Sequence, residues 1–443
     1  MEALIDAKVS PYLVRVIGSY LRDREIMTDE GQSYPMTAGV PQGSVLGPTL
    51  WNLAYNGVLK LPFEPGVSTV AYADDLVVLV KARTERELVY KANDALDAVS
   101  RWMSARQLQL ASEKTEAILL IGRKKCGPLS GLALDGHPIE VKQQVKYLGV
   151  LLDRSLTFSP HVKCAVEKAK KAVNGLTRIM PRTRGAGETT RRLLANVATS
   201  IVLYASPVWK KALDRSQNRE RLASAQRLMA IRICRAYRTV STGAVLVLAR
   251  QIPWHLLVRE RSEAYHERMS LVTRSDGEAV SRKGWEERRS LTIERWQQEW
   301  SEASGTGRWT RKLIPDLRPW WARTSGEVTY YLTQLLTGHG CFQEYLHGRR
   351  RATEPGCVLC PSWDSDDVEH TLFECEFFRP ERERLRSDMD WNLSAVELVS
   401  KMLEDDACWK KIASFANEVL AKKVALARAR IRSSEAAAVQ VTV

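Results

Sequence analysis

The chain has 443 residues, of which 44% are hydrophobic and 27% charged, and its formal net charge is +14. This composition indicates folded domains rather than a disordered chain, and no apolar run reaches the roughly 18 residues that a membrane span requires. The excess of cations favours nucleic acid or a membrane surface as a partner, although a basic protein that is merely soluble is the alternative.

The first ten residues, MEALIDAKVS, contain two acids and lack the basic-then-apolar pattern of a secretory signal. We therefore expect an intracellular protein whose eight cysteines are free or metal-bound rather than paired in disulfides. Three of the eight lie between residues 357 and 375, which makes that segment a candidate metal site.

The first 158 residues mix helical and strand patterns. Apolar spacing, a candidate N-cap at Ser10 and Pro11 in the first turn predict a helix over 10–22. The glycines and prolines of GVPQGSVLGP predict a shaped loop over 39–48, after which Pro48 can open a helix. The other expected elements are two short strands over 69–80 that turn at a pair of acids, an amphipathic helix over 85–108, and strands over 116–121 and 145–152.

From about residue 160 the pattern is mostly helical. The Arg- and Gly-rich stretch over 181–192 predicts a loop, and the Gly, Pro and Trp residues over 304–321 predict a break between helices. A compact cysteine-containing unit is expected over about 338–380. A basic helix that runs to about 432 follows it.

Asp74 and Asp75 lie side by side in TVAYADDLVVLV, between two apolar strands. Adjacent carboxylates repel each other and are costly to bury without a cation. A tight strand–turn–strand would hold both carboxylates at a fixed place as oxygen ligands for magnesium, and two such ions can clamp the oxygens of a phosphoryl transfer. Taken alone, a pair of acids in a turn is more often a solvated hairpin tip.

Four segments resemble, in order and spacing, the motifs of reverse transcriptases. They are GVPQGSVLGPTLWNLAYNGVL (39–59), TVAYADDLVVLV (69–80), LQLASEKTEAILL (108–120) and KYLGVLLDRSLTF (146–158). YLVRVIGSYLRDR, SIVLYASPVW, WTRKLIP and LTGHGCF, with Ala73 in YADD, resemble non-LTR retrotransposons, and in particular the type-1 retrotransposable elements of arthropods. The resemblance covers essentially the whole chain.

This resemblance implies a role for residues on both sides of the hairpin. Asp74 and Asp75 would be catalytic and would hold two Mg²⁺ ions. Gln42, Gly43 and Tyr72 would lie against the template and the incoming nucleotide.

Two later motifs have implied roles as well. Lys114 would donate a proton to the departing pyrophosphate or balance its charge, or else it is a surface lysine. Leu148 and Gly149 would support the primer end, or else they form a plain turn packed on the core.

The metal site of this family needs a further aspartate, in a pattern like Asp-x-x-x-Ala-Phe-Asp upstream of the loop, and this chain has no such pattern. Asp6 is followed by neither the aromatic residue nor the second acid. We therefore expect a C-terminal fragment of a longer polyprotein that also carries an endonuclease, and Met1 need not be a natural start. Alone, the chain should bind metal weakly and polymerise poorly or not at all.

The cysteine segment has the spacing C-x2-C-x9-H-x4-C, formed by Cys357, Cys360, His370 and Cys375. Four sulfur and nitrogen ligands suit a structural, tetrahedral Zn²⁺ site, and the Cys-x-x-Cys pair can lie on one turn. Four unrelated residues and a redox Cys-x-x-Cys are the alternatives. The spacing resembles the C-terminal zinc motif of non-LTR elements, which implies binding to nucleic acid.

Other residues allow two interpretations. His339 and His347 are more often structural than metal ligands. The GRRR at 348–351 and the late KK and RAR clusters could contact phosphates or form solvated helix faces. Three tryptophans could stack on bases, although packing in a core is the commoner role; they are Trp309, Trp320 and Trp321.

We therefore predict an α+β protein: a partial polymerase palm with an antiparallel sheet, a helical thumb, and a mostly helical C-terminal region with a small zinc module. The expected divisions are 1–158 (palm), 159–240 (thumb-like), 241–337 (helical linker region), 338–380 (CCHC zinc module) and 381–443 (basic helical tail).

The predicted function is that of an RNA-directed DNA polymerase, a nucleotidyltransferase of a transposable element. It would act in target-primed reverse transcription on an RNA template, a DNA primer or target, and dNTPs, in the nucleus at the site of integration and without a membrane partner. The alternative is a non-catalytic, zinc-dependent RNA- or DNA-binding protein derived from such an element.

Overall fold

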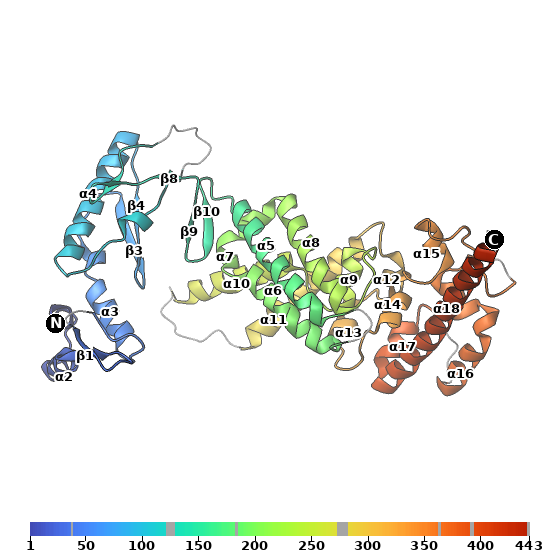
Figure 1. The fold of residues 1–443 in the computed structure, drawn as a ribbon. Coiled ribbons are helices and arrows are strands. Elements are labelled where there is room, and N and C mark those ends of the chain that lie inside the picture. The colour runs from blue at the N-terminus through green and yellow to red at the C-terminus, as the bar shows by residue number, and fades with distance from the viewer. Residues whose placement is uncertain are drawn as a thin grey trace. The chain divides into compact units, whose positions relative to one another are not determined.

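A computed structural model describes residues 1–36, 39–120, 129–181, 185–272, 282–361, 365–389 and 394–440. The chain divides into two compact units, Met1–Leu156 and Thr157–Val443 (Figure 1). This division lies within two residues of the expected end of the first region at 158, whereas the boundaries expected at 240, 337 and 380 fall inside the second unit. No helix in the described part of the chain is long and apolar enough to cross a membrane.

The first unit begins with helices α1 (Glu2–Asp6) and α2 (Pro11–Leu21) and a hairpin of β1 (Arg24–Met27) and β2 (Ser33–Met36). The predicted helix over 10–22 is confirmed: the Ser10 side chain accepts a hydrogen bond from the Leu13 N–H, and Pro11 occupies the first turn. Helix α3 (Gly47–Tyr55) follows the GVPQG loop, and its first turn contains Pro48 as expected.

The expected strand pair is β3 (Val67–Tyr72) and β4 (Asp75–Val80), and the long helix after it is α4 (Glu85–Ser104). Helix α4 begins where Thr84 accepts a hydrogen bond from the Glu87 N–H, and it packs against both strands. The apolar face of α4 is buried as its spacing predicts, and the buried residues are Ala92, Ala95, Val99, Trp102 and Met103.

The remaining strands are short. Strand β5 (Ala117–Ile118) covers only part of the expected 116–121 and pairs in parallel with β8 (Val141–Lys142), and residue 121 lies outside the described residues. Strands β6 (Ala133–Leu134) and β7 (His137–Pro138) form a small hairpin. The stretch expected as a strand over 145–152 is a hairpin of β9 (Gln144–Tyr147) and β10 (Val150–Asp153).

The described strands therefore form five two-stranded ladders, four antiparallel and one parallel, rather than one continuous antiparallel sheet. The expectation of mixed helices and strands in the first unit is confirmed, and the continuous sheet is not seen in this part of the chain. Two-stranded ladders are marginally stable alone and depend on a helix for cover, which α4 provides for β3 and β4.

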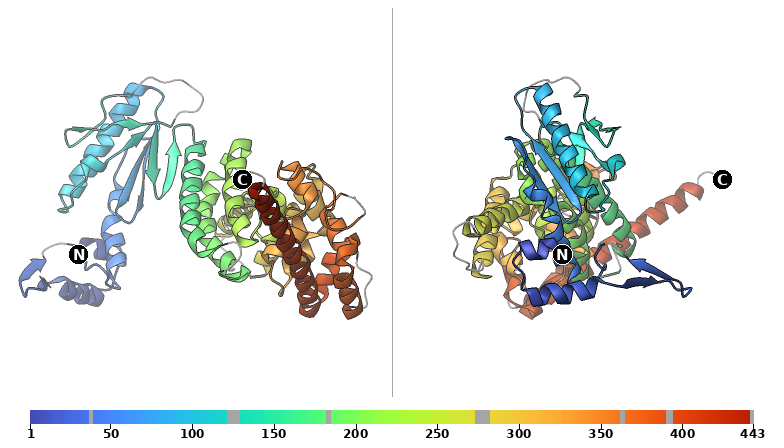
Figure 2. Two further views of the ribbon diagram at one scale, coloured as in Figure 1. Left: turned by 45° about the vertical axis from the view of Figure 1, so that its right-hand side comes forward. Right: turned by 90° about the vertical axis from the view of Figure 1, so that its left-hand side faces the viewer.

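The second unit is helical in the part that the structure describes (Figure 2). Helix α5 (Ser159–Leu176) packs against α6 (Glu188–Leu203) and α8 (Ser216–Ile233). Helix α10 (Trp254–Val272) lies against α6, α7 (Ser206–Trp209), α8 and α11 (Arg282–Glu302). Helix α9 (Thr242–Leu248) is buried beside α8.

Two expectations for this unit are wrong in detail. Residues 182–184 of the loop predicted over 181–192 lie outside the described residues, and its last residues belong to α6, which begins at Glu188. The break predicted over 304–321 contains two short helices, α12 (Arg308–Leu313) and α13 (Leu317–Ala322). Pro315 separates these helices, because a proline interrupts a helix without preventing helices on either side.

A buried ion pair connects the start of α6 to the region after α13. Both carboxylate oxygens of Glu188 accept hydrogen bonds from Arg323 Nη2, at 3.0 and 3.1 Å, and one also accepts from the Val328 N–H. The Arg323 guanidinium lies 4.3 Å from the centre of the Trp320 ring, and burial lowers its pKa to about 10. This contact is one reason why the expected thumb-like and linker regions pack as one unit.

The C-terminal part contains α14 (Tyr330–Thr337), α15 (Gln343–Gly348), α16 (Arg379–Met389), α17 (Leu398–Glu404) and the long α18 (Asp406–Gln440). Helix α18 corresponds to the basic helix expected to run to about 432, and it contacts α14, α16 and α17.

The tryptophans singled out as possible stacking residues have packing partners. Trp320 is buried, Trp309 donates its Nε1–H to the Leu335 carbonyl, and Trp321 packs edge-on against Trp296. These contacts favour the core interpretation over base stacking.

Candidate catalytic hairpin and candidate zinc site

The two acids stand at the tip of the β3–β4 hairpin. The ladder runs from the pair Val67 and Val80 to the pair Tyr72 and Asp75, so Ala73 and Asp74 form a two-residue turn. Ala73 has a φ of +54°, a left-handed value that favours glycine at the first central position of such turns. The expected turn at the acids is confirmed, and both carboxylates are exposed.

Two aromatic side chains of helix α3 hydrogen-bond the backbone of this turn. Trp51 Nε1 donates a 2.9 Å hydrogen bond to the Ala73 carbonyl, and the Tyr55 hydroxyl lies 3.5 Å from the Asp74 carbonyl as its donor. The two rings are stacked, with centroids 5.1 Å apart. Burial first, and then the charges of Asp74 and Asp75, raise the pKa of the Tyr55 hydroxyl, so this group stays protonated and can donate.

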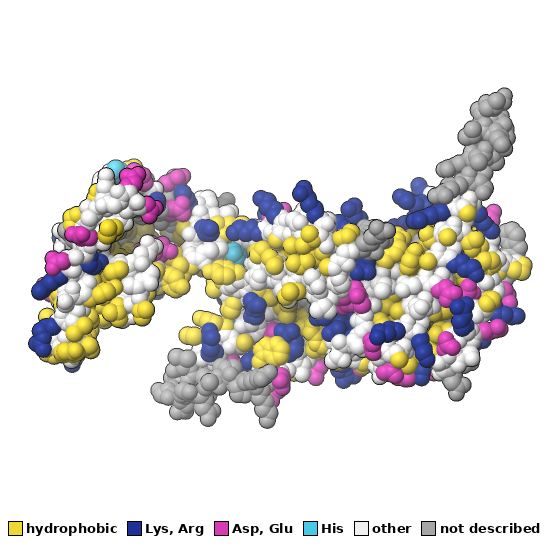
Figure 3. Space-filling model, turned by 60° about the horizontal axis from the view of Figure 1, so that its bottom comes forward, with side chains coloured by type: hydrophobic (Ala, Val, Ile, Leu, Met, Phe, Trp, Pro, Cys, Tyr) yellow, Lys and Arg dark blue, Asp and Glu magenta, His cyan; other side chains and the backbone are white. Residues whose placement is uncertain are grey.

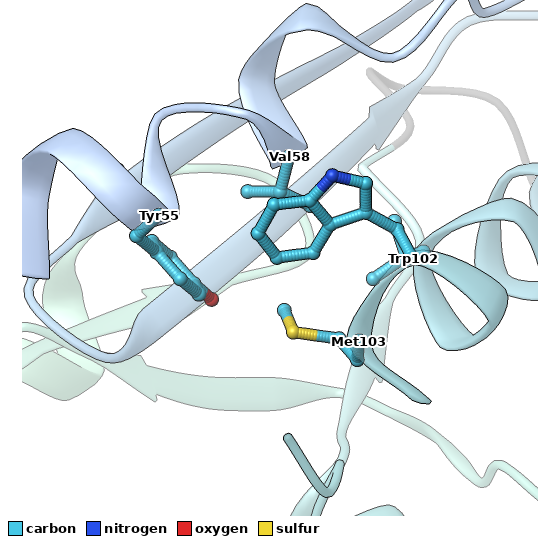
Figure 4. Close-up of a cluster of buried hydrophobic side chains, with 5 residues drawn as sticks. Tyr55, Val58, Trp102 and Met103 are labelled. Atoms are coloured by element: carbon cyan, nitrogen blue, oxygen red, sulfur yellow. The ribbon is translucent and has the colours of Figure 1, made fainter. Parts of the chain in front are cut away.

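A small core fixes α3 against α4. Tyr55 and Val58 face Trp102 and Met103 in Figure 4, and Val99 completes the buried cluster. The Tyr55 and Trp102 rings meet edge to face with centroids 6.2 Å apart. The position of the hairpin turn thus depends on packing between two helices that lie on either side of the hairpin in sequence.

No cation of the described chain neutralises the two acids. Neither Asp74 nor Asp75 takes part in an ion pair within the described residues, and the nearest connections of the turn run through backbone carbonyls. Two adjacent exposed carboxylates are oxygen ligands suited to Mg²⁺. The described residues group no third His, Cys, Asp or Glu ligand with them, because the only group of three or more found there lies in the second unit.

Internal hydrogen bonds stabilise the loop before α3. Ser44 Oγ donates to the Pro41 carbonyl at 2.8 Å and accepts from the Gly47 N–H at 3.0 Å. Gln42 and Gly43 lie exposed at its tip, Gly43 has a φ of +82°, and a Cβ there would meet nothing within 4 Å. The open surface at this tip is compatible with the predicted contact to template and nucleotide.

The other predicted residues of the first unit are exposed on separate turns. Tyr72 is 64% exposed beside the acids. Lys114 ends a short helical turn, Ser112–Lys114, and no ion pair joins it to either acid in the described residues. Leu148 and Gly149 both have positive φ and form the β9–β10 turn. The structure therefore places each of these residues at the surface.

In the second unit, Cys357, Cys360, His370 and Cys375 converge, with their ligand atoms all within 4.8 Å of one another. Cys357 Sγ lies 3.9 Å from Cys375 Sγ, and Cys360 Sγ lies 3.4 Å from His370 Nε2. Zinc bonds of ~2.3 Å to sulfur and ~2.0–2.1 Å to nitrogen, at tetrahedral angles, would place such atoms ~3.8 and ~3.5 Å apart. The four side chains therefore fit a closed zinc site, and the sulfur separation is far too long for a disulfide.

Local structure brings the ligands together. A β-bridge between Gly356 and Ser365 closes the chain around the Cys-x-x-Cys turn, and His370 begins a single wide helical turn, His370–Glu374, that ends at Cys375. The Asp367 side chain accepts from the His370 N–H at 2.7 Å. The hydrogen bond between the two sulfurs lowers the pKa of Cys357 and raises that of Cys375, so without metal the pair shares a proton that an ion would replace.

Helix α18 contacts this cluster through cations. The Lys423 side chain is 95% buried. Its Nζ donates hydrogen bonds to Asp366 Oδ1 and, at 2.8 Å, to Thr371 Oγ1. Arg430 donates to the Val358 carbonyl, inside the Cys-x-x-Cys turn, at 2.7 Å. Lys422 of the same clusters pairs with Glu381 at 2.8 Å. Three residues of the late KK and RAR clusters therefore have structural partners, which corrects the interpretation of those clusters as purely phosphate contacts or solvated faces.

Sequence reasoning did not predict the supporting role of four residues. Trp51 and Tyr55 hydrogen-bond the hairpin turn, and Asp366 and Lys423 form the buried ion pair beside the cysteine cluster. The aromatic pair at i and i+4 in WNLAY was a visible signal of one helix face. His339, in contrast, lies outside the cluster and hydrogen-bonds Thr239, in agreement with its structural interpretation.

Comparison with known proteins supports the resemblance. The family described as reverse transcriptase (RNA-dependent DNA polymerase) matches residues 2–152. A Pol polyprotein from type-1 retrotransposable element R1 2 of Nasonia vitripennis is 30% identical over 356 residues, covering 77% of this chain and 85% of the relative. A 115 kDa protein in type-1 retrotransposable element R1DM of Drosophila melanogaster is 28% identical over 405 residues, covering 88% of this chain.

Some relatives are much longer than this chain. It spans 39% of the R1DM protein and 40% of a Pol polyprotein from element R1 of Bradysia coprophila, to which it is 28% identical over 410 residues. An RNA-directed DNA polymerase from the mobile element jockey matches 50% of this chain at 30% identity. The chain belongs to the Pol polyproteins of type-1 (R1) non-LTR retrotransposable elements, and its first unit contains their reverse transcriptase domain.

Proposed function

We propose that this chain is part of an RNA-directed DNA polymerase in which Asp74 and Asp75 hold the catalytic Mg²⁺. The observation that carries the proposal is the hairpin tip. Trp51 and Tyr55 hydrogen-bond the backbone of this turn, and its two exposed carboxylates form no ion pair within the described residues. In this reaction a primer 3′-hydroxyl attacks the α-phosphate of a dNTP and pyrophosphate leaves. Bound magnesium supplies positive charge to the attacking and leaving oxygens.

The first unit would act as part of the palm, and α5, α6 and α8 as the thumb. Gln42, Gly43 and Tyr72 are proposed to contact the template and the nucleotide, and their exposure supports this role. The Leu148–Gly149 turn is proposed to support the primer end. Lys114 is proposed to serve the departing pyrophosphate.

We also propose a structural Zn²⁺ at the Cys357, Cys360, His370 and Cys375 cluster, because the distances fit and a filled site leaves no open position. The intact polyprotein would act in target-primed reverse transcription in the nucleus, with element RNA as template and chromosomal DNA as primer. This placement rests on the family alone.

The chain by itself is proposed to polymerise poorly, since the described residues supply no third carboxylate beside Asp74 and Asp75. The same observation supports a second candidate function for the chain alone, a zinc-dependent RNA- or DNA-binding protein without catalysis. The intact hairpin and its support from α3 favour the polymerase for the protein that contains this chain.

Primer extension on an RNA template tests the proposal. A polyprotein that contains this chain, together with an upstream Asp-x-x-x-Ala-Phe-Asp segment, should extend a DNA primer with dNTPs and Mg²⁺. Asp74→Asn should abolish extension, while Asp29→Asn, in the turn of the β1–β2 hairpin, should leave it unchanged. Equal extension by the wild type and the Asp74→Asn variant would contradict the assignment.

A further inference from the structure

A group of half-buried aromatic rings gathers where the segment after α8 meets α14 and α15. We call it the Tyr–Arg patch and define it by the rings of Tyr237, Tyr330, His339 and Tyr345 and by two exposed arginines. Arg349 lies over the Tyr345 ring, and Arg238 directly follows Tyr237 in sequence. Its members come from three segments that span more than a hundred residues of sequence. It lies outside the candidate metal cluster and has no role in the polymerase chemistry described above.

The rings hold one another in place. The Tyr237 and Tyr330 hydroxyls lie 2.7 Å apart, and the Tyr237 and Tyr345 rings meet edge to face with centroids 6.2 Å apart. The His339 and Tyr345 rings are 4.8 Å apart, and Thr239 Oγ1 bridges them at 2.9 Å from His339 Nδ1 and 2.6 Å from the Tyr345 hydroxyl. The rings are thus preorganised, and each remains partly exposed.

Arginine charges act on two of the rings. The Arg349 guanidinium lies 5.8 Å from the centre of the Tyr345 ring. Burial, and then the charges of Arg349 and Arg227, lower the pKa of His339 to about 4, so this ring is neutral near pH 7. Burial raises the pKa of the neighbouring Tyr331 hydroxyl, and the charge of Arg428 opposes this rise.

The exposed arginines of the patch have no carboxylate partner in the described part of the chain. Arg238 and Arg349 are exposed and take part in no ion pair among the described residues. Other exposed cations of this unit do: Lys312 pairs with Glu369 at 2.7 Å, and Arg384 with Glu418 at 3.2 Å. On the face shown in Figure 3, Lys and Arg side chains are spread among acidic and apolar ones. The combination of unpaired arginines with a fixed ring cluster therefore distinguishes the patch from general surface charge.

We propose that the Tyr–Arg patch binds single-stranded RNA. Arginine side chains pair with phosphates, and unstacked bases lie on aromatic rings or guanidinium planes, whereas a duplex keeps its bases stacked inside. Single-stranded RNA can use both features, because its bases stack on neutral rings and its phosphates pair with the arginines. An acidic protein would pair with the arginines but would not stack on the rings. The choice of RNA over single-stranded DNA rests on the proposed function, in which the template is RNA.

Binding of a labelled, unstructured RNA oligonucleotide to the zinc-loaded chain, followed by fluorescence anisotropy, tests the ring contribution. Tyr345→Ala should weaken binding about five- to a hundredfold, the usual range for losing one stacked base. Tyr345→Phe keeps the ring and loses only the hydroxyl, so it should bind within about twofold of the wild type. Matching circular dichroism spectra of the two variants will show that the difference does not come from unfolding.

Charge reversal tests the phosphate contribution. Arg238→Glu with Arg349→Glu should weaken binding and flatten its dependence on salt, because fewer counterions are released. Arg86→Glu with Arg101→Glu makes the same change in net charge on exposed positions of α4 and should leave binding nearly unchanged. A Tyr345→Ala variant with wild-type affinity, or equal losses in both charge-reversal pairs, would overturn the proposal.

Competition separates the ligands. Unlabelled RNA should displace the probe, while duplex DNA and single-stranded DNA of the same sequence should compete less well. DNA of either form competing at least as well as RNA would overturn the assignment. These measurements need no polymerisation, so their failure is distinguishable from a failure of the proposed enzyme activity.

Discussion

The two candidate metal sites of this chain are built in opposite ways. In the first unit, Asp74 and Asp75 are exposed on a two-residue turn and have no third ligand beside them in the described residues. In the second unit, four ligands from one short segment converge, and Cys357, His370 and Cys375 are buried. Their surroundings differ too: a hairpin and two helices support the acids, whereas the cysteine cluster is backed by a buried ion pair.

This difference separates catalytic from structural use of metal. A catalytic site must leave coordination positions for substrate phosphates and water, so an exposed, partly filled ligand set suits it. A structural zinc site fills all four positions, and its binding energy contributes to folding. The first site is therefore expected to gain its function from added partners, and the second from the chain alone.

The largest effect is expected from a substitution that removes one ligand of the candidate zinc site. Cys360→Ser removes one of four ligands, and structural zinc sites contribute ~10–16 kcal/mol of binding energy in small peptides. We expect the variant to lose its zinc on dialysis and to unfold around residues 355–378 at a much lower temperature, measured by metal analysis and thermal unfolding. Cys164→Ser, at a lone exposed cysteine of α5, should change neither. Equal zinc content in both variants would contradict the assignment.

The next effect tests the support behind that site. Lys423→Met leaves the Asp366 carboxylate buried without its cation, and breaking a buried pair in this way costs ~3–5 kcal/mol. Urea unfolding followed by circular dichroism should show this loss. Lys410→Met, which breaks the exposed pair with Asp406 near the start of the same helix, should cost less than ~1 kcal/mol. Similar losses from the two variants would mean that the buried pair has no special structural role.

A smaller effect concerns the open site. Trp51→Phe keeps an aromatic ring, although a smaller one, and removes the hydrogen bond to the Ala73 carbonyl. The loss of this bond should cost ~1 kcal/mol. Hydrogen exchange should accelerate in β3 and β4 near the turn. Trp285→Phe, at a 53% exposed ring of the second unit, serves as the control and should leave that exchange unaltered. Unchanged exchange in the Trp51 variant would show that α3 does not hold the turn.

The smallest effect has the opposite sign. Ala73→Gly relieves a left-handed backbone at φ +54° and should stabilise the hairpin by roughly 0.5–1 kcal/mol. Ala71→Gly, in the regular part of β3, should instead destabilise it, because glycine weakens a strand interior. Chemical unfolding of the two variants compares them directly, and a loss of stability in Ala73→Gly would contradict the strain at the turn.

Local features were predictable from sequence, and contacts between distant segments were not. The hairpin at Asp74 and Asp75 follows from apolar strands around two acids, and the Cys–His cluster from ligands close in sequence. The hydrogen bond from Trp51 to Ala73 joins residues 22 apart in sequence, and the bond from Lys423 to Asp366 joins residues 57 apart. No local sequence pattern contains both partners of either bond. The short helices α12 and α13 were missed because Pro315 and the surrounding glycines predict a break whether or not single helical turns form beside it.

Metal retention tests the contrast between the two sites most directly. The chain would be loaded with Zn²⁺ and with Mn²⁺ as a substitute for Mg²⁺, dialysed extensively, and analysed for both metals. The account predicts about one retained zinc per chain, as a closed four-ligand site requires, and no retained manganese. Retained manganese that is lost in Asp74→Asn would mean that this chain completes the catalytic site itself, and the absence of retained zinc would mean that the cysteine cluster is not a structural metal site.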